Sequence, residues 1–255
     1  YIRGFGASNI LAWRPDMTDS EIETAFGTDE DQLGFTILRL MVEPDKSRWH
    51  RYISTAKKAH DMGVTIIASP WHAPSNMVET VNGECRVKHD MYNEYATHLD
   101  SFVTYMANND VPIYGLSVQN EPEYGEDWTG WSVNEMFTFM KDNAHAITGT
   151  NVMAPESFNF NRAYSDPILN DPVSCANTDI ICGHIYGGGL TSYPLAEQKG
   201  KEVWMTEYLI NTDNPPSDID IGWTGAIQTA IRISNCMDAN MSAYVWWYFV
   251  RYYGP

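Results

Sequence analysis

Positive charge is scarce in this sequence. Its 255 residues include 16 Lys and Arg against 33 Asp and Glu, which gives a formal net charge of −17 at pH 7. So acidic a chain argues against nucleic acid or an anionic membrane surface as a partner. No apolar run approaches the roughly 20 residues of a membrane-spanning helix, and the first residues lack the charged and apolar regions of a signal peptide.

Motifs for metals and cofactors are also missing. The four cysteines have neither CxxC nor Cys/His ligand spacing, which argues against zinc, and HExxH and GxSxG patterns are absent. The chain also has no GxGxxG or P-loop. We therefore expect no metal and no cofactor. Two disulfides or free thiols both remain open for Cys85, Cys175, Cys182 and Cys236.

What the sequence does contain is a regular alternation of apolar strands and helical segments. Eight strands are predicted, at 4–9, 36–42, 64–69, 113–120, 151–156, 180–186, 202–208 and 243–250. Seven helices are predicted between them, at 18–26, 48–62, 91–107, 132–149, 163–169, 195–199 and 223–239. Thr18 with Glu21, and Ser132 with Glu135, have the spacing of capping boxes. A polar loop is expected around Asn82-Gly83.

This alternation favours an α/β fold of the (β/α)8 TIM-barrel type over a doubly wound open sheet, which has strands of the same kind. We expect residues 1–255 to form one catalytic barrel. Because the chain stops soon after the last strand, we expect the barrel to be incomplete at the C-terminus, lacking helix eight and any side β-domain.

Carboxylates and aromatic rings gather where the predicted strands end. Asn120-Glu121-Pro122 ends the fourth strand and Thr206-Glu207-Tyr208 ends the seventh. The active sites of such barrels lie at the C-terminal strand ends. Aromatic residues make up 13% of the chain, and flat rings there can stack on sugars, although a large core would use them too. Two carboxylates inside an aromatic cup suit cleavage of a glycosidic bond.

These strand ends resemble those of the 4/7 superfamily of retaining glycosidases, and within it glycoside hydrolase family 30. Further similar stretches are Gly4-Phe5-Gly6-Ala7-Ser8, Ser69-Pro70-Trp71, Gly183-His184-Ile185-Tyr186-Gly187 and Trp246-Trp247-Tyr248. The resemblance implies a retaining hydrolase in which Glu121 is the general acid/base and Glu207 the nucleophile. It also implies that Asn120 binds the sugar 2-hydroxyl and that Arg39 pairs with Glu207 and keeps it ionised.

Within family 30 the chain is most similar to the endoxylanases that need glucuronic acid branches on xylan. In that branch an Arg and a Tyr after strand eight hold the glucuronate, and Arg251 and Tyr253 match them. Thr212 stands where a hydroxyl residue assists, and Val250 replaces the usual second arginine. The remaining expected sugar contacts are Trp71, Tyr186 and Trp247 beside the cleaved bond and Tyr124 on the leaving side.

Three alternatives stay open at this point. His184 either orients a catalytic group or is a satisfied buried histidine. The substrate is glucuronoxylan, or another β-linked glycan, or unbranched xylan. The third alternative is that the protein is a catalytically inactive barrel that only binds carbohydrate. A polysaccharide substrate leads us to expect an extracellular protein, and we expect a monomer.

Overall fold

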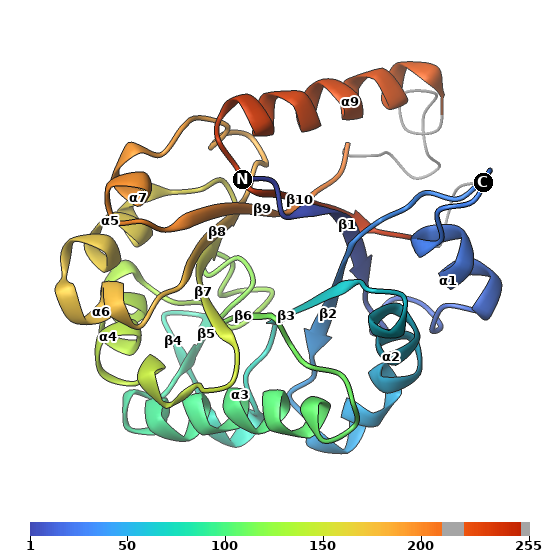
Figure 1. The fold of residues 1–255 in the computed structure, drawn as a ribbon. Helices are drawn as coiled ribbons and strands as arrows, with labels where there is room; N and C mark the ends of the chain where they lie inside the picture. Colours follow the sequence, from blue (N-terminus) through green and yellow to red (C-terminus); the bar gives the residue numbers. More distant parts are fainter. Residues whose placement is uncertain (211–221, 251–255) are drawn as a thin grey trace.

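The computed structural model describes residues 1–210 and 222–250, and it contains a closed barrel of eight parallel strands with helices on the outside (Figure 1). Around the barrel the strands follow the order β1-β10-β9-β8-β7-β6-β3-β2. Their bounds are Gly4–Asn9 (β1), Ile37–Val42 (β2), Thr65–Pro70 (β3), Gly115–Ser117 (β6), Asn151–Ser157 (β7), Ile180–His184 (β8), Glu202–Tyr208 (β9) and Ala243–Tyr248 (β10). The predicted TIM barrel is confirmed.

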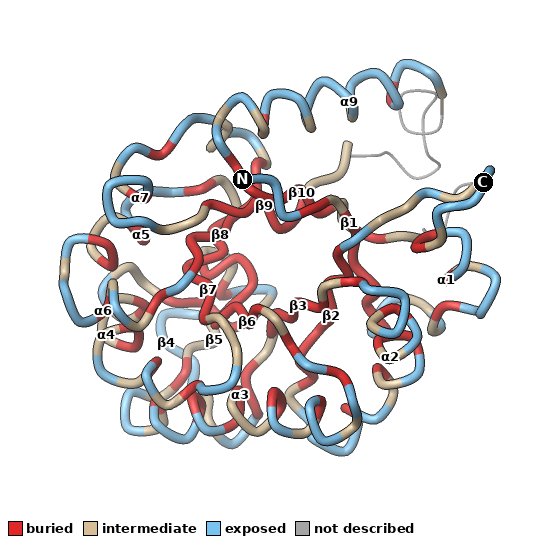
Figure 2. The backbone as a smooth tube through the Cα atoms, viewed as in Figure 1, coloured by how far each residue is buried: buried red, intermediate tan, exposed pale blue. Residues whose placement is uncertain are grey.

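Most residues of the barrel strands are buried, as their red colour in Figure 2 shows, and all six residues of β2 are buried. Such strands have both faces covered, by the lumen side chains on one side and by the helices on the other. The lumen is filled by a cluster of side chains from six strands: Ile37, Ile67, Met153, Ile180, Cys182, Trp204, Ala243 and Val245. Outward-facing residues such as Leu38 and Leu40 pack instead against the helices. Since side chains alternate along a strand, Arg39 faces inward two residues above Ile37. The strand therefore delivers a guanidinium to the barrel interior.

The described helices are α1 (Asp19–Phe26), α2 (Ile53–Asp61), α3 (Tyr92–Ala107), α4 (Val133–Asp142), α5 (Arg162–Asn170), α6 (Pro172–Ala176), α7 (Pro194–Gln198) and α9 (Trp223–Asp238). Both predicted capping boxes are present, at Thr18 with Glu21 and at Ser132 with Glu135. The residues that the structure describes cover helix α9 poorly. Trp223, Ile227 and Ile231 are exposed along it. No described helix is both long and apolar enough to cross a membrane.

The segment predicted as a polar loop is a β-hairpin, so that prediction was wrong. Its strands are β4 (Val78–Val81) and β5 (Glu84–Val87). Asn82 and Gly83 connect them with φ of 54° and 90°, the left-handed conformations that a tight hairpin turn requires. The polar residues on its solvent face hid the alternation of the two short strands.

Other predicted elements differ in extent. The helix predicted at 132–149 ends at Asp142, and the strands predicted at 180–186 and 243–250 end at His184 and Tyr248. The helix predicted at 48–62 begins as a 3₁₀ segment, Lys46–Tyr52, capped by the Asp45 side chain, and becomes α-helical at Ile53. The fourth barrel strand was predicted to reach Asn120 but ends at Ser117. All four cysteines are free, with Cys182 and Cys236 buried; the open alternative of disulfides is thereby excluded.

Gly6 marks the closest approach of β1 to β2. It pairs in register with Ile37, and a Cβ built on Gly6 would stand 1.9 Å from the Ile37 carbonyl oxygen. Backbone atoms of a buried strand cannot move aside, so Gly6→Ala should lower the free energy of unfolding by about 3 kcal/mol through overpacking. Equilibrium unfolding in urea measures the change.

Gly188→Ala is the matched control, because its Cβ would meet only the Asn159 Cβ, at 3.9 Å. That change should stay within about 0.5 kcal/mol of the parent protein. Equal losses for the two variants would contradict the close packing of β1 on β2.

Candidate active site

Glu121 lies just beyond the end of β6, where the chain leaves the regular ladder. The Asn120 N–H donates to the Pro70 carbonyl at 2.8 Å, and the Glu121 N–H donates to the Glu156 carbonyl at 3.0 Å. Glu121 has a φ of 45°, in the left-handed region that non-glycine residues seldom occupy and that concentrates at functional sites. Neighbouring strand ends thus hold the backbone that aims this carboxylate into the barrel mouth.

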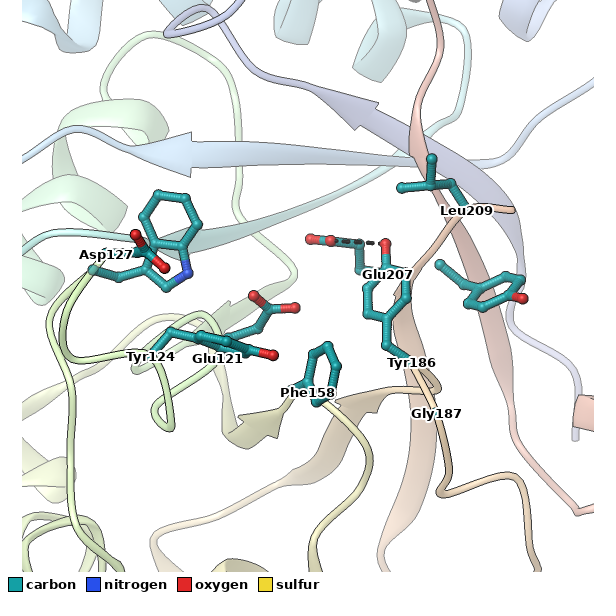
Figure 3. A pocket seen from close by; sticks show the side chains of 10 residues that line it. Glu121, Tyr124, Asp127, Phe158, Tyr186, Gly187, Glu207 and Leu209 are labelled. Atoms are coloured by element: carbon teal, nitrogen blue, oxygen red, sulfur yellow. Dashed lines mark hydrogen bonds between the residues drawn. The ribbon is translucent and has the colours of Figure 1, made fainter. Parts of the chain in front are cut away.

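Glu207 faces Glu121 across the pocket (Figure 3). One oxygen of each carboxylate and one ring nitrogen of His184 all lie within 4.8 Å of one another. The register of β9 against β8 skips a residue, so that His184 pairs with Glu207 after Gly183 pairs with Met205. A bulge of this kind re-aims side chains, and it turns Glu207 toward the mouth.

Two donors hold the Glu207 carboxylate in place. Arg39 Nη1 donates to Oε2 at 2.7 Å, and the Tyr186 hydroxyl donates to Oε1 at 3.1 Å. Burial raises the pKa of Glu207 above its ordinary value, while the His184 and Arg39 cations oppose that rise. The predicted pairing of Arg39 with Glu207 is confirmed.

Arg39 is fully buried and connects most of the polar groups beneath the mouth. Its Nη2 donates to Asn120 Oδ1 at 2.6 Å and lies 3.2 Å from Glu156 Oε1. Its Nε donates to the Ser69 hydroxyl at 3.2 Å. Burial lowers the pKa of this guanidinium, but Glu156 and Glu207 outweigh that and raise it. Arg39 was predicted among the substrate contacts; its zero exposure places it beneath the substrate, as a support for the carboxylates.

His184 was also predicted among the substrate contacts, and it too is fully buried. Its Nδ1 lies 2.9 Å from Glu121 Oε1, and its Nε2 lies 3.7 Å from Glu156 Oε1 and 4.0 Å from Glu207 Oε2. Burial lowers the pKa of His184, yet Glu207 and the bonds to the other carboxylates outweigh it and raise the pKa to about 9. Of the two alternatives for this residue, contact with a candidate catalytic group is the one observed.

Glu156 is the group that sequence reasoning left without a role, although it was noticed as a carboxylate at a strand end. It is fully buried and lies on β7 at a register shift between Pro155 and Ser157, with a φ of 56°. Burial raises its pKa, but Arg39 and His184 outweigh this and lower it to about 2. Glu156 is therefore an anion beneath the other two glutamates.

Two cavities open on either side of the carboxylate pair, with volumes of about 550 and 410 Å³, and both are lined by Glu121, Trp128 and Glu207. The larger is also bordered by Tyr124, Phe158, Tyr186 and Tyr208. The smaller is also bordered by Trp13, Trp71, Trp247 and Tyr248. Trp71, Tyr124, Tyr186 and Trp247 all line a cavity, but Tyr186 lies with Tyr124 in the larger one and not, as predicted, with Trp71 and Trp247. Their contacts with sugar stay predictions. Trp13, Trp128, Phe158 and Tyr208 were missed because they lie outside the stretches read as strand ends or were given no role there.

The Asn120 side chain contacts the polar groups around Arg39 through one of its two polar atoms. Its Oδ1 accepts from Arg39, while its Nδ2 has no hydrogen-bond partner within residues 1–210 and 222–250. Asn120 is buried and borders neither cavity, so its contact with the sugar 2-hydroxyl stays a prediction. Three further predicted contacts, Thr212, Arg251 and Tyr253, lie outside the described residues.

Glu121, His184 and Glu207 are near enough to one another to share a metal ion. His184 Nδ1 already lies 2.9 Å from Glu121 Oε1. The Arg39 guanidinium also occupies one oxygen of Glu207. The arrangement suits acid–base and nucleophilic chemistry better than coordination.

Comparison with known proteins agrees with this geometry. A profile of the glycosyl hydrolase family 30 TIM-barrel domain matches residues 18–145. The curated glucuronoxylanase XynC of Bacillus subtilis strain 168 is 46% identical over 265 aligned residues, covering 100% of this chain and 62% of that protein. The chain thus spans less than two thirds of the length of this curated relative.

Two solved structures are similar throughout the chain. A family 30 endoxylanase from Clostridium papyrosolvens C71 has a TM-score of 0.86 at 39% identity, covering 97% of this chain and 65% of that one. The family 30 subfamily 8 xylanase Xyn30A of Clostridium acetobutylicum has a TM-score of 0.83 at 34% identity, covering 97% and 64%.

Removing the Arg39 charge should destabilise the protein strongly. Arg39→Met leaves Glu156 and Glu207 buried without their nearest cation, and breaking such a pair costs about 3–5 kcal/mol of the free energy of unfolding. Arg3→Met is the control, since the Arg3–Glu202 pair has side chains 37% and 28% exposed and should lose less than about 1 kcal/mol. Similar urea midpoints for both variants would show that the buried network is not stabilising.

Proposed function

The chain belongs to glycosyl hydrolase family 30, and on that premise we propose that it is an endo-acting β-1,4-xylanase that cleaves glucuronoxylan with retention of anomeric configuration. Because the curated relative is longer than this chain, the proposal concerns the chemistry of the barrel itself. It is supported by the paired glutamates, the aromatic cavities and the relatives named above.

The spacing of the two glutamates is the observation that carries the proposal. Retaining glycosidases have carboxyl groups about 5–5.5 Å apart, whereas inverting ones need about 6.5–9.5 Å to admit a water molecule. One oxygen of Glu121 and one oxygen of Glu207 lie within 4.8 Å of each other, a close approach that favours the retaining arrangement. That separation fits direct attack by one carboxylate on the sugar.

In the first step a Glu207 oxygen attacks the anomeric carbon, and the bond from that carbon to the leaving oxygen breaks. The bonding electron pair goes to the leaving oxygen, which takes the proton of Glu121. Arg39 and Tyr186 hold the plane of the Glu207 carboxylate for this attack. The products are a glycosyl ester of Glu207 and an ionised Glu121.

In the second step a water oxygen attacks the same carbon, and Glu121 takes a proton from the water. The ester bond to Glu207 breaks, and its electron pair restores the carboxylate. Two inversions give net retention. His184, which lies 2.9 Å from Glu121, faces the carboxylate that carries the negative charge between the two steps.

The choice of glucuronoxylan draws on the relatives and on charge. XynC of Bacillus subtilis is named a glucuronoxylanase and shares 46% of its aligned residues with this chain. A chain with a net charge of −17 repels an anionic branch, so binding requires a directed cation. Arginine offers a planar fork that matches a carboxylate. We assign that role to Arg251, assisted by Tyr253 and Thr212.

An extracellular location and a monomeric state are part of the same proposal. A polymeric substrate must be met where it lies, outside the cell. Both statements stay predictions.

Glu207→Ala should reduce turnover of glucuronoxylan by at least about 10⁴-fold, because no second group can form the glycosyl ester. Proton NMR of the parent reaction should show the β-anomer of the new reducing end first. First appearance of the α-anomer would overturn retention. A circular dichroism spectrum equal to that of the parent at the assay temperature is the control for folding, because loss of the buried Arg39 pair should itself lower the unfolding midpoint.

Arg251→Ala should lower kcat/KM on glucuronoxylan by about 10- to 100-fold while changing activity on unbranched xylan less than about twofold, because a lost charge-assisted pair is worth about 1.5–3 kcal/mol. Arg3→Ala serves as the control, since Arg3 precedes β1 at the opposite end of the barrel. Equal losses on both polymers would show that Arg251 has a structural role and does not bind the branch. The substrate would then be unbranched xylan or another β-linked glycan, which the products from branched xylan would distinguish.

A further inference from the structure

Glu156 is a buried carboxylate that the two-step chemistry does not use. It lines neither cavity beside the catalytic pair, and no exposed surface remains on the residue. Substrate therefore cannot touch it. Its carboxylate still lies within 4 Å of two cations, at 3.2 Å from Arg39 Nη2 and 3.7 Å from His184 Nε2.

Burial makes this arrangement costly unless its charges balance. An isolated ion buried in a protein loses several kcal/mol of solvation, and both oxygens of Glu156 lack a well-aligned hydrogen-bond donor within the described ranges. Glu156 is thus stabilised chiefly by the two neighbouring positive charges. Conversely, the two cations need its negative charge.

The charges of the cluster sum to zero before the first step. In the mechanism proposed above, Arg39 and His184 are cations, Glu156 and Glu207 are anions, and Glu121 carries the proton that it will donate. After that step Glu207 is a neutral ester and Glu121 is an anion. One negative charge has moved from Glu207 to Glu121, and the sum is again zero. Without Glu156 the sum would be +1 at both stages, unless a cation lost its proton.

We propose that Glu156 is a positioning residue whose permanent negative charge keeps His184 protonated, so that His184 can face whichever of Glu207 and Glu121 is ionised. The proposal rests on the two-step function given above. Its geometric basis is that His184 reaches all three carboxylates, at 2.9 Å from Glu121, 3.7 Å from Glu156 and 4.0 Å from Glu207. Glu156 is the one of the three whose charge does not change in the reaction.

The other titratable groups around His184 do not compete for this role. Burial raises the pKa of the Cys182 thiol and of the Tyr186 hydroxyl well above their usual values, so both stay neutral. The charged groups that contact the imidazole come from separate strand ends: Glu121 (after β6), Glu156 (β7) and Glu207 (β9). Arg39 on β2 pairs with two of them, Glu156 and Glu207.

The direction of the pH effect follows from the charge. The His184 pKa of about 9 is raised, so its stabilising contacts are present below its ordinary pKa of about 6.5 and are lost as pH rises toward 9. Removing the negative charge of Glu156 makes every neighbouring acid easier to deprotonate. The imidazolium should then be lost at lower pH, and the alkaline limb of activity should move with it.

Glu156→Gln tests the proposal, because it removes the charge and keeps the side-chain shape. We expect the alkaline limb of kcat/KM on glucuronoxylan to move down by about one pH unit or more. ¹⁵N NMR of histidine-labelled protein should show the same fall in the His184 titration, with His184→Asn identifying its signals. Glu156→Asp is the matched control: it retains the charge, and both titrations should stay near those of the parent protein.

Three outcomes would overturn the proposal. The first is an unchanged His184 titration in Glu156→Gln, and the second is an equal shift in the Gln and Asp variants, which would point to packing. The third is loss of the His184 proton below pH 7 in the parent protein. This outcome can be measured even if Glu156→Gln does not fold. If the parent protein cleaves no xylan, the proposed function fails, while the NMR titration still decides the role of Glu156.

Discussion

The buried guanidinium of Arg39 is the constraint on which the site depends. A fully buried cation is tolerated only where anions and acceptors surround it, and Arg39 meets Glu207, Glu156, Asn120 and Ser69. These partners come from different strand ends, so the ion network can form only after the barrel has closed. Fold and site therefore form together, and the barrel mouth is held at a fixed geometry by charge.

Irregular backbone at the strand ends aims the carboxylates within that network. Glu121 and Glu156 both adopt positive φ, and Glu156 and Glu207 lie where the register of β7, β8 and β9 shifts by a residue. Regular strands would alternate side chains between lumen and helices. The bulges break this alternation at the mouth, where a carboxylate must face its partner and the cavity instead of the helix layer.

Overall charge and local charge differ sharply in this protein. The whole chain carries −17, yet the five ionisable groups beneath the mouth balance when one catalytic carboxyl is protonated. Aromatic rings line both cavities beside them, and burial of Arg39, Glu156 and His184 strengthens each charge interaction inside. In a balanced cluster, transfer of negative charge from one glutamate to the other leaves no uncompensated charge in the buried site at either stage.

The sequence by itself determined the barrel, the strand ends that carry Glu121 and Glu207, both capping boxes and four of the aromatic lining residues, because these depend on local periodicity and on where a strand stops. Tertiary structure decided the rest. It showed that Arg39 and His184 are fully buried, that Glu156 lies against both of them, and that Trp13 and Trp128 reach the cavities. The physical reason is that burial, ion pairing and bulge register arise between strands distant in the chain, and no local pattern encodes them.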